Sequence, residues 1–547
     1  MEKRVILAFV LSFAILYGFR LLYAPGPTGP TPTEPVKSVS SVEKTPEAPA
    51  PVGNRPTGTS TDLPATSGNI QAERSEDVTV DTPFYSATIS NVGSSLKSFK
   101  LKAYADAEGH PIELIDEKSG EKLGWPLAIS TGDAGLDDML AKARFAVQRQ
   151  DNRISMEYAE NGLHVRRVFE FDLRNYDFSL DTKISKDGKP VPYSLLWQGR
   201  FGDQSIPPDP AKRNTLYQQD TAFKRLGLRS LKEKQEINAV RVGVEDQYFL
   251  AMFLSAEGAG PVSVDKRSYP GPDGKPVDTF LLSARVPEPE PVRVYVGPKD
   301  RTWLTTVDPQ LDAVIDYGWF QIIARPLVFF LLLIHSYVGN FGWAIIFLTI
   351  AINFLLFPLR LKQQISMQKM QKIQPQMRTL QDRYKKLKVN DPRRAQVQAE
   401  MMGLYKQHGV NPMGGCLPLV LQMPVLFGFY SMLSVSIELR RAPWILWIKD
   451  LSQHDPYYII PVLMAVSMFV MQRMTPTTVD PAQAKMMMIM PLMLTVMFLW
   501  VQSGLMLYWL TSNMVGIGQQ VFINKYWSPR SEAKLQAQSK PKEAADN

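Results

Sequence analysis

Apolar residues are distributed unevenly along this chain of 547 residues. Up to about residue 310, apolar and polar positions alternate over short stretches, whereas residues from about 318 to 524 contain long apolar runs. The mean hydropathy of −0.13 is therefore an average over two unlike parts. This pattern predicts a soluble part followed by a group of membrane spans.

The alternation between about residues 75 and 310 has the period of β-strands. Ile154, Met156 and Tyr158 alternate with polar residues, and the following Asn161-Gly162 is typical of a hairpin turn. The alternation continues from Tyr176 to Ile184 and returns at Val292, Val294 and Val296, and a turn cluster lies at 270–274. Many short strands without helical crossovers predict a large antiparallel β-sandwich over residues 75–316.

Catalytic motifs are absent from this β region. His110 and His164 are isolated, and no Gly-x-Ser-x-Gly is present. A scaffold or interaction role is favoured over an enzyme, and a carbohydrate- or peptide-binding cleft is the alternative.

The first apolar run follows Lys3 and Arg4 and extends from Val5 to Tyr23. It is similar to a secretory signal, but no small-x-small cleavage site follows it. We therefore expect a retained signal-anchor span at 1–23. Residues 24–74 are rich in Pro, Thr and Ser and predict a disordered stalk.

The later apolar runs differ in length. Within 317–338 the uninterrupted apolar part, Leu327 to Ile334, is too short to cross a core of about 30 Å, so we expect an amphipathic helix in the outer interface. A true span there is the alternative, and it would invert the later topology. Further runs occupy 339–359, 416–438, 457–472 and 489–523.

The last run would be about 52 Å long as one helix, so a break at Gln502-Ser503-Gly504 divides it into two spans. The fold class predicted is a polytopic α-helical membrane protein with six spans, five of which form a core at 339–524.

Positive charge is concentrated in one segment. The whole chain carries +8, and residues 360–415 hold 12 Lys and Arg against three acidic residues. The positive-inside rule places this segment in the cytoplasm, together with both termini and the basic tail 525–547, and it places the β domain on the opposite side.

Apolar residues in the basic segment recur at helical spacing, as in Ile373, Met377 and Tyr384, and again in Val397 and Met401. Asp391 is the expected N-cap of the second helix, with Pro392 at its first position. The two stripes predict an antiparallel helical hairpin at 362–410. Its basic faces either set topology alone or contact ribosomal RNA or acidic lipids. The candidate contact residues are Lys369, Lys372, Arg378, Arg383, Lys385, Lys386, Arg393 and Arg394.

Several polar residues fall within the predicted spans: Asn353, Gln422, Ser512 and Asn513. Because polar groups in hydrocarbon cost free energy, they either bond neighbouring helices or form a polar groove near the inner side. Acidic and basic residues are absent from the middle of the spans, which argues against a proton or ion relay.

Three stretches carry a family resemblance. The segment from Asn411 to Leu433, which contains the single Cys416, the segment from Glu438 to Met464 and the segment from Phe498 to Asn513 resemble the YidC/Oxa/Alb membrane insertases in order and spacing. With the signal-anchor, stalk and large β domain, the chain resembles the Gram-negative form, whose periplasmic domain is a β-supersandwich.

The resemblance implies an insertase and folding chaperone of the bacterial inner membrane that acts alone or beside the Sec translocon. It implies nascent membrane proteins, the ribosome and membrane lipids as partners. It also implies five core spans around a groove open to cytoplasm and lipid. Gln422 matches a groove position, and Tyr508 and Trp509 match an aromatic pair near the substrate path.

One residue departs from the family pattern. The family usually places an arginine five residues before the Pro that ends the second span, and counting back from Pro358 gives Asn353. Either Arg360 takes the place of that cation, or the protein relies on the polarity of the groove and on local thinning of the bilayer alone.

The sequence argues against two other classes of membrane protein. A transporter would need inverted repeats or charges within the spans, and an intramembrane protease would need a Ser–His pair at span depth. Neither is found, since His335 and His454 fall at or beyond the interface. We expect no enzyme activity, no catalytic residue, no cofactor, no metal and no small-molecule substrate.

Overall fold

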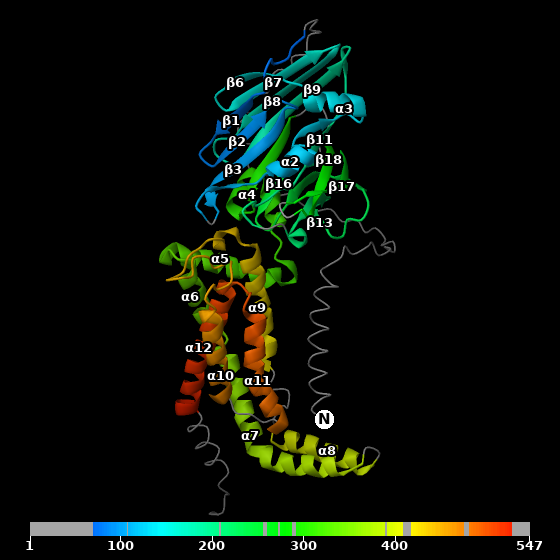
Figure 1. Cartoon of the computed structure of the whole chain (residues 1–547). Coiled ribbons are helices and arrows are strands. Elements are labelled where there is room, and N and C mark those ends of the chain that lie inside the picture. The colour runs from blue at the N-terminus through cyan, green and yellow to red at the C-terminus, as the bar shows by residue number, and fades with distance from the viewer. Residues whose placement is uncertain are drawn as a thin grey trace, which may run out of the picture.

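The computed structural model describes residues 69–527, apart from 107, 207–208, 255–259, 272–273, 287–290, 389–390, 409–416 and 475–480. The predicted signal-anchor 1–23, most of the stalk and the tail from 528 lie outside the described residues, as does the segment 411–416. A β domain sits at one end of a group of helices, and a two-helix projection extends from the other end (Figure 1).

The β domain consists of three antiparallel sheets. The central sheet has ten strands, and sheets of four and five strands accompany it. The four-stranded sheet comprises β1 (Asp77–Asp81), β2 (Tyr85–Ser90), β3 (Ser95–Ala105) and β4 (Pro111–Glu113). The ten-stranded sheet comprises β13 (Ala222–Gly227), β12 (Asn214–Gln219), β15 (Arg241–Glu245), β16 (Phe249–Leu254), β19 (Val292–Pro298), β9 (Asp177–Lys186), β8 (Leu163–Phe171), β7 (Arg153–Glu160) and β6 (Ala146–Gln150), with β10 (Lys189–Pro190) beside β9. The five-stranded sheet comprises β14 (Gln235–Ala239), β17 (Gly260–Pro270), β18 (Pro276–Arg285), β11 (Ser194–Gln198) and β5 (Ala128–Ser130).

The strand and turn signals of the sequence are confirmed. β7 and β8 pair around Asn161 and Gly162, whose φ angles of 50° and 75° are those of a left-handed turn. The turn cluster at 270–274 lies between β17 and β18, which pair up to Pro270 and Pro276.

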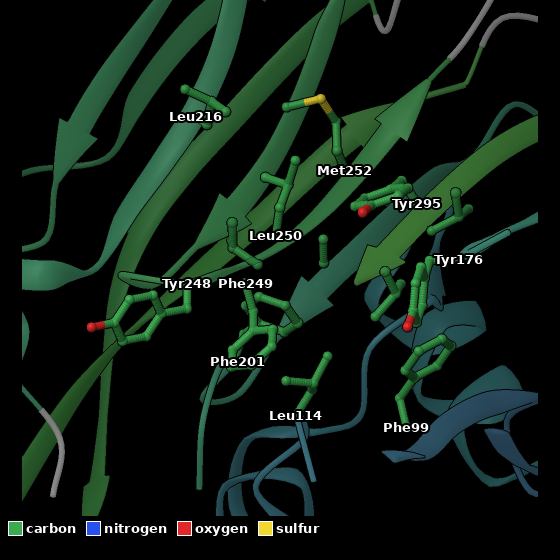
Figure 2. Packing of buried hydrophobic residues seen from close by; sticks show 14 of the residues in the cluster. Phe99, Leu114, Tyr176, Phe201, Leu216, Tyr248, Phe249, Leu250, Met252 and Tyr295 are labelled. Atoms are coloured by element: carbon green, nitrogen blue, oxygen red, sulfur yellow. The ribbon is translucent and has the colours of Figure 1, made fainter. Parts of the chain in front are cut away.

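The core of the β domain fills the space between the sheets with large side chains. Phe99 of β3, Phe249 of β16 and Tyr295 of β19 are fully buried and come from different sheets or strands (Figure 2). Each such burial contributes roughly 1.5–3 kcal/mol. The inner-facing positions of the alternating strands therefore supply the stability of this domain.

Two predictions for this region need correction. The β domain contains short helices, α2 (Glu117–Leu123) and α3 (Ala134–Lys142), which the strand pattern did not predict. It also begins before residue 75, because Ile70 pairs with Ala159 and the amide of Ala72 donates to the carbonyl of Arg144. Both features depend on contacts distant in sequence, which the local pattern does not show.

A short linker joins the β domain to the helices. It contains α4 (Arg301–Val307), a turn at Pro309–Val314 and a turn at Gly318–Phe320. The helices that follow are α5 (Gln321–Val338), α6 (Phe341–Leu355), α7 (Phe357–Lys386), α8 (Arg393–Gln407), α9 (Leu417–Val435), α10 (Ile459–Met474), α11 (Pro481–Phe498) and α12 (Ser503–Phe522).

The helix α5 occupies the segment predicted to lie in the interface. Gly318–Val338 is the one helix among the described residues whose length and apolar composition would suffice for a span by itself. In Figure 1, α5 lies at the end of the bundle nearest the β domain. Its place in the membrane stays a prediction.

Several helix bounds differ from the expected ones. The second predicted span, 339–359, is α6 followed by the start of α7, with a bend of 56° between the two helices. The predicted hairpin therefore begins at Phe357 within α7. The break near Gln502 is confirmed, but α11 begins at Pro481, eight residues before the expected start. A last turn, Ile523–Trp527, extends α12 into the predicted tail.

The antiparallel hairpin of α7 and α8 is present, and the stripe residues Ile373, Met377 and Val397 are buried between them. The helix α8 begins at Arg393, one residue later than predicted. Its N-cap is Pro392, which makes no side-chain capping bond, and the expected N-cap Asp391 precedes it and accepts the backbone N–H of Arg393 at 2.9 Å.

Candidate functional site: a buried polar ladder

Polar side chains of α6, α9 and α12 form a connected set inside the helical core. On α6, Asn353 is 4% exposed, and its Nδ2 donates to the carbonyl oxygen of Thr349 at 2.8 Å. Its Oδ1 accepts a hydrogen bond of 3.3 Å from the hydroxyl of Ser512 on α12. A polar residue of α6 is thus paired with one of α12.

Gln422 of α9 continues the set. Its Nε2 donates to the hydroxyl of Tyr508 and lies 3.5 Å from the hydroxyl of Ser512. The ring of Tyr508 stacks on Phe429 with centroids 4.1 Å apart. Tyr508 is therefore held by an apolar contact on its face and a polar contact at its tip.

Arg360 joins the set from α7, beyond the bend. Its Nη1 donates to Oε1 of Gln519 at 2.9 Å, and Nε2 of Gln519 donates to the backbone oxygen of Asn353 at 3.1 Å. The guanidinium lies against α12, where a Cβ at Gly516 would be 2.9 Å from Nη1. The set from Arg360 through Gln519, Asn353, Ser512 and Gln422 to Tyr508 is called the polar ladder below.

Two predicted groove residues lie apart from the polar ladder. Asn513 turns toward α10, where its Nδ2 donates to the hydroxyl of Ser467 at 3.0 Å. Trp509 packs on Phe498 of α11, with ring centroids 5.0 Å apart. The structure thus brings together Asn353, Gln422, Tyr508 and Ser512, while Asn513 and Trp509 line the side of α12 that faces α10 and α11.

Thr349 and Gln519 were missed by the sequence reasoning. Thr349 precedes Asn353 by four residues and Gln519 follows Ser512 by seven, so each shares a helix face with a predicted residue. This spacing is the signal that could have identified them.

The basic residues of the hairpin divide into two groups. The side chains of Lys369, Lys372, Arg378, Arg383, Lys386 and Arg393 are exposed, whereas Arg394 is partly buried with its guanidinium 4.5 Å over the ring of Tyr384. Arg393 is paired with Asp391 at 2.8 Å. The side chain of Lys385 lies outside the described residues.

Donors suited to a metal gather at one place in the described part of the chain. Atoms of Asp106, Glu108 and His110 lie within 4.8 Å of one another in a surface loop of the β domain. The Asp106 side chain already accepts the backbone N–H groups of Glu108 and His110. This loop is far in sequence from the polar ladder and takes no part in it.

Comparison with known proteins matches both parts of the chain. Residues 77–330 match the family described as the YidC periplasmic domain, and residues 333–530 match the 60Kd inner membrane protein family. The chain is 36% identical to the membrane protein insertase YidC of Citrifermentans bemidjiense over 96% of its own length and 99% of the relative's. The chain belongs to the YidC membrane protein insertase family.

A second relative agrees with this assignment. The YidC insertase of Syntrophus aciditrophicus is 34% identical over 96% of this chain and all of its own length (100%). A crystal structure of an active YidC insertase with its first transmembrane domain resolved is 21% identical, with a TM-score of 0.36, and the alignment covers 84% of this chain and 94% of that one.

Membership in the family settles the general activity. The protein is an inner-membrane insertase with a periplasmic β domain, acts on membrane protein substrates and is not an enzyme.

Proposed function

We propose that this insertase passes the polar flank of a substrate along the polar ladder while the apolar segment of the substrate moves into lipid. The observation that carries the proposal is the unbroken chain of hydrogen bonds from Arg360 to Tyr508, which joins the four helices α6, α7, α9 and α12. Such groups cost free energy in hydrocarbon unless they are paired.

The lengths of the bonds in the ladder suit exchange with a substrate. The contacts of Ser512 with Asn353 and Gln422 are 3.3 and 3.5 Å long, beyond the usual range of hydrogen-bond lengths, so both are weak. A polar flank that enters can replace these bonds with its own, so each group stays paired during passage. Moving such a flank through plain hydrocarbon would instead cost several kcal/mol per group.

Arg360 supplies a positive charge at the cytoplasmic end of the ladder, according to the proposed topology. Its bond to Gln519, which in turn bonds the backbone of Asn353, connects it to the position where the family usually places an arginine. We assign to Arg360 the attraction of acidic substrate flanks, with Asn353 as the polar residue next along the path.

The topology that we propose has six spans, with both termini and the hairpin in the cytoplasm. Exposed basic side chains of α7 and α8 then face the ribosome and acidic lipid headgroups. Insertion alone or beside the Sec translocon is part of the same proposal. Hydrophobic transfer and the membrane potential drive the reaction, since the sequence has no ATP-binding motif.

The purified protein in liposomes tests this proposal. A single-span substrate with a short charged tail is offered to protein-containing and empty liposomes, and its insertion is scored by protease protection. Asn353→Leu should lower insertion of the charged-tail substrate more than that of an uncharged-tail version. The matched control is Thr495→Val, which removes a buried hydroxyl whose hydrogen bond, among the described residues, is to Pro491 within α11. Insertion equal to that of empty liposomes, or equal loss for both tails, contradicts the proposal.

A further inference from the structure

A buried ion pair connects the end of α9 to the β domain. After α9, the chain makes a short turn at Ile437–Leu439, and the Nη2 atom of the next residue, Arg440, donates to Oδ2 of Asp203. The side chains of Arg440 and Asp203 are 7% and 0% exposed. The guanidinium also donates to the carbonyl oxygen of Ala105 at 3.2 Å.

Hydrogen bonds within the β domain fix the position of the Asp203 carboxylate. Its Oδ1 accepts the N–H and the hydroxyl of Ser205 at 2.9 and 2.6 Å. Its own N–H donates to Oδ2 of Asp246 at 2.8 Å. Asp246 in turn accepts Nζ of Lys299 through its backbone oxygen at 2.6 Å. The acceptor for Arg440 is therefore pre-organised by the β domain.

A second contact ties the last turn of α9 to the same part of the β domain. Gln247, next to Asp246 in the turn between β15 and β16, donates from Nε2 to the backbone oxygen of Ser434 at 2.8 Å. The Arg440 guanidinium also lies 5.9 Å from the ring centroid of Phe249, a buried residue that Figure 2 shows among the β-domain core. Three polar contacts and one cation–π contact thus join the end of α9 and the turn after it to the β domain.

The helix held in this way also carries a member of the polar ladder. Gln422 lies 12 residues before Ser434, a separation of about 18 Å along an α-helix. Between them, Phe429 stacks on Tyr508, and a Cβ at Gly428 would come within 2.8 Å of Ile323 on α5. The outer end of α9 and Gln422 therefore belong to one helix, which packs against α12 and α5 between them.

We infer that Arg440 is a positioning residue that clamps the outer end of α9 to the β domain and thereby sets the place of Gln422 on the polar ladder. Removing one partner of a buried pair leaves the other charge buried and uncompensated, so the clamp opens when either Arg440 or Asp203 is lost. The role of Arg440 in insertion rests on the proposed function, in which the substrate passes along the polar ladder. The contact that holds α9 to the β domain does not depend on that proposal.

The first arm of the test measures the clamp in the full-length protein in nanodiscs. Cysteines that carry spin labels replace the exposed Lys186 of the β domain and the exposed Lys449 of the loop between α9 and α10. The single native cysteine is removed by Cys416→Ser. The parent protein should give one narrow distance distribution. Arg440→Gln and Asp203→Asn should each broaden it, and the exchanged pair, Arg440→Asp with Asp203→Arg, should narrow it again.

Two further variants keep this arm decisive. Arg441→Gln is the matched control, since it removes the neighbouring charge, for which no contact with the β domain is found among the described residues. Gln247→Ala removes the Ser434 contact without leaving a buried charge, so it reports on the clamp if the Arg440 variant does not fold. An unchanged distribution in Arg440→Gln or, where that variant does not fold, in Gln247→Ala overturns the clamp.

The second arm measures insertion of the charged-tail substrate by the same variants in liposomes. The rate should fall at least threefold in Arg440→Gln and Asp203→Asn and recover in the exchanged pair, which a loss of folding alone would not do. A broadened distribution with an unchanged rate overturns the positioning role. Failure of the parent protein to insert would instead contradict the proposed function and leave the distance result standing.

Discussion

The guanidinium of Arg360 donates a hydrogen bond of 2.9 Å to the side-chain oxygen of Gln519, across the bend that separates α6 from α7. This contact brings a cation that follows Pro358 back to the polar residues of the core. A cation that follows the end of α6 can therefore contact the polar residues inside the helical core, because the arginine side chain is long enough to reach Gln519 on α12.

Arg360→Gln should lower insertion of substrates with acidic flanks by roughly tenfold, the effect of losing about 1.5 kcal/mol from one hydrogen bond to a charged group. Substrates with neutral flanks should change little. The measurement is protease protection in liposomes with two substrates that differ only in the flank. Arg360→Lys keeps the charge and should retain part of the preference.

The control for this prediction is Lys362→Gln, which removes an exposed charge from the same helix two residues away. If Arg360→Gln and Lys362→Gln affect acidic and neutral flanks alike, the cation acts only through the general charge of the inner face.

Local patterns predicted the elements that depend on local chemistry. The hairpin at Asn161-Gly162 and the break at Gln502 follow from turn geometry and from the length of an apolar run, and both are confirmed. The change from alternating positions to long apolar runs predicted the order of the β domain and the helices. The sequence left open whether Asn353, Gln422 and Ser512 bond neighbouring helices or form a polar groove, and the structure shows direct contacts of Ser512 with the other two.

Features set by contacts distant in sequence were not predicted. The rotation of α12 decides that Ser512 faces α6 while Asn513 bonds Ser467, and adjacent polar residues in a sequence do not show which face each will take. Likewise, the clamp joins Asp203 to Arg440 across 237 positions, and no local period encodes such a pair.

Gly243 of β15 is expected to be intolerant of any side chain. A Cβ there would lie 2.0 Å from the backbone oxygen of Ala251 on the adjacent β16, and neither strand can move without disturbing the central sheet. Gly243→Ala should therefore lower the free energy of unfolding by about 1–3 kcal/mol or more. Chemical unfolding of the full-length protein in detergent, followed by tryptophan fluorescence, measures the change.

Gly227→Ala provides the comparison for this substitution. Gly227 lies in β13, at the edge of the same sheet, and its nearest potential contact is an ordinary 3.5 Å. Its replacement should leave the unfolding midpoint nearly unchanged, and similar losses for both variants would show that the close approach at Gly243 is not the cause.

Docking of the β domain should depend on pH through Glu438, in the turn after α9. Burial raises the pKa of the Glu438 carboxyl to about 7, and the negative charge of Asp300 adds to this effect. Tyr104 and Tyr317 also face this carboxyl, and Arg440 follows it in the chain. The charged form of Glu438 is therefore disfavoured in the docked protein.

The sign follows from the direction of this pKa shift. Because the docked state binds the proton more tightly, docking is strongest below the ordinary pKa near 4.5 and weakens as the pH rises to about 7. The loss is roughly 3 kcal/mol at most. The distance distribution between the two labelled domains should broaden over this range, and Glu438→Gln should make it independent of pH. Broadening toward acid pH would contradict this assignment.

The exposed basic residues of the hairpin should bind the ribosome through phosphate groups. Arg378, Arg383 and Lys386 are exposed along α7. Replacing all three by Gln should weaken ribosome binding. The slope of the logarithm of the binding constant against the logarithm of the salt concentration should become less steep by roughly 1 for each residue that contacts a phosphate. Co-sedimentation of the protein with ribosomes over a series of salt concentrations measures both quantities.

Arg393→Gln is the matched substitution, because the guanidinium of Arg393 is already paired with Asp391. It should change the salt dependence less than any one of the α7 substitutions does. If the triple variant binds ribosomes normally but loses binding to vesicles with anionic lipids, the basic face of the hairpin contacts the membrane surface. If the triple variant keeps both ribosome binding and vesicle binding, these charges only determine on which side of the membrane the hairpin lies.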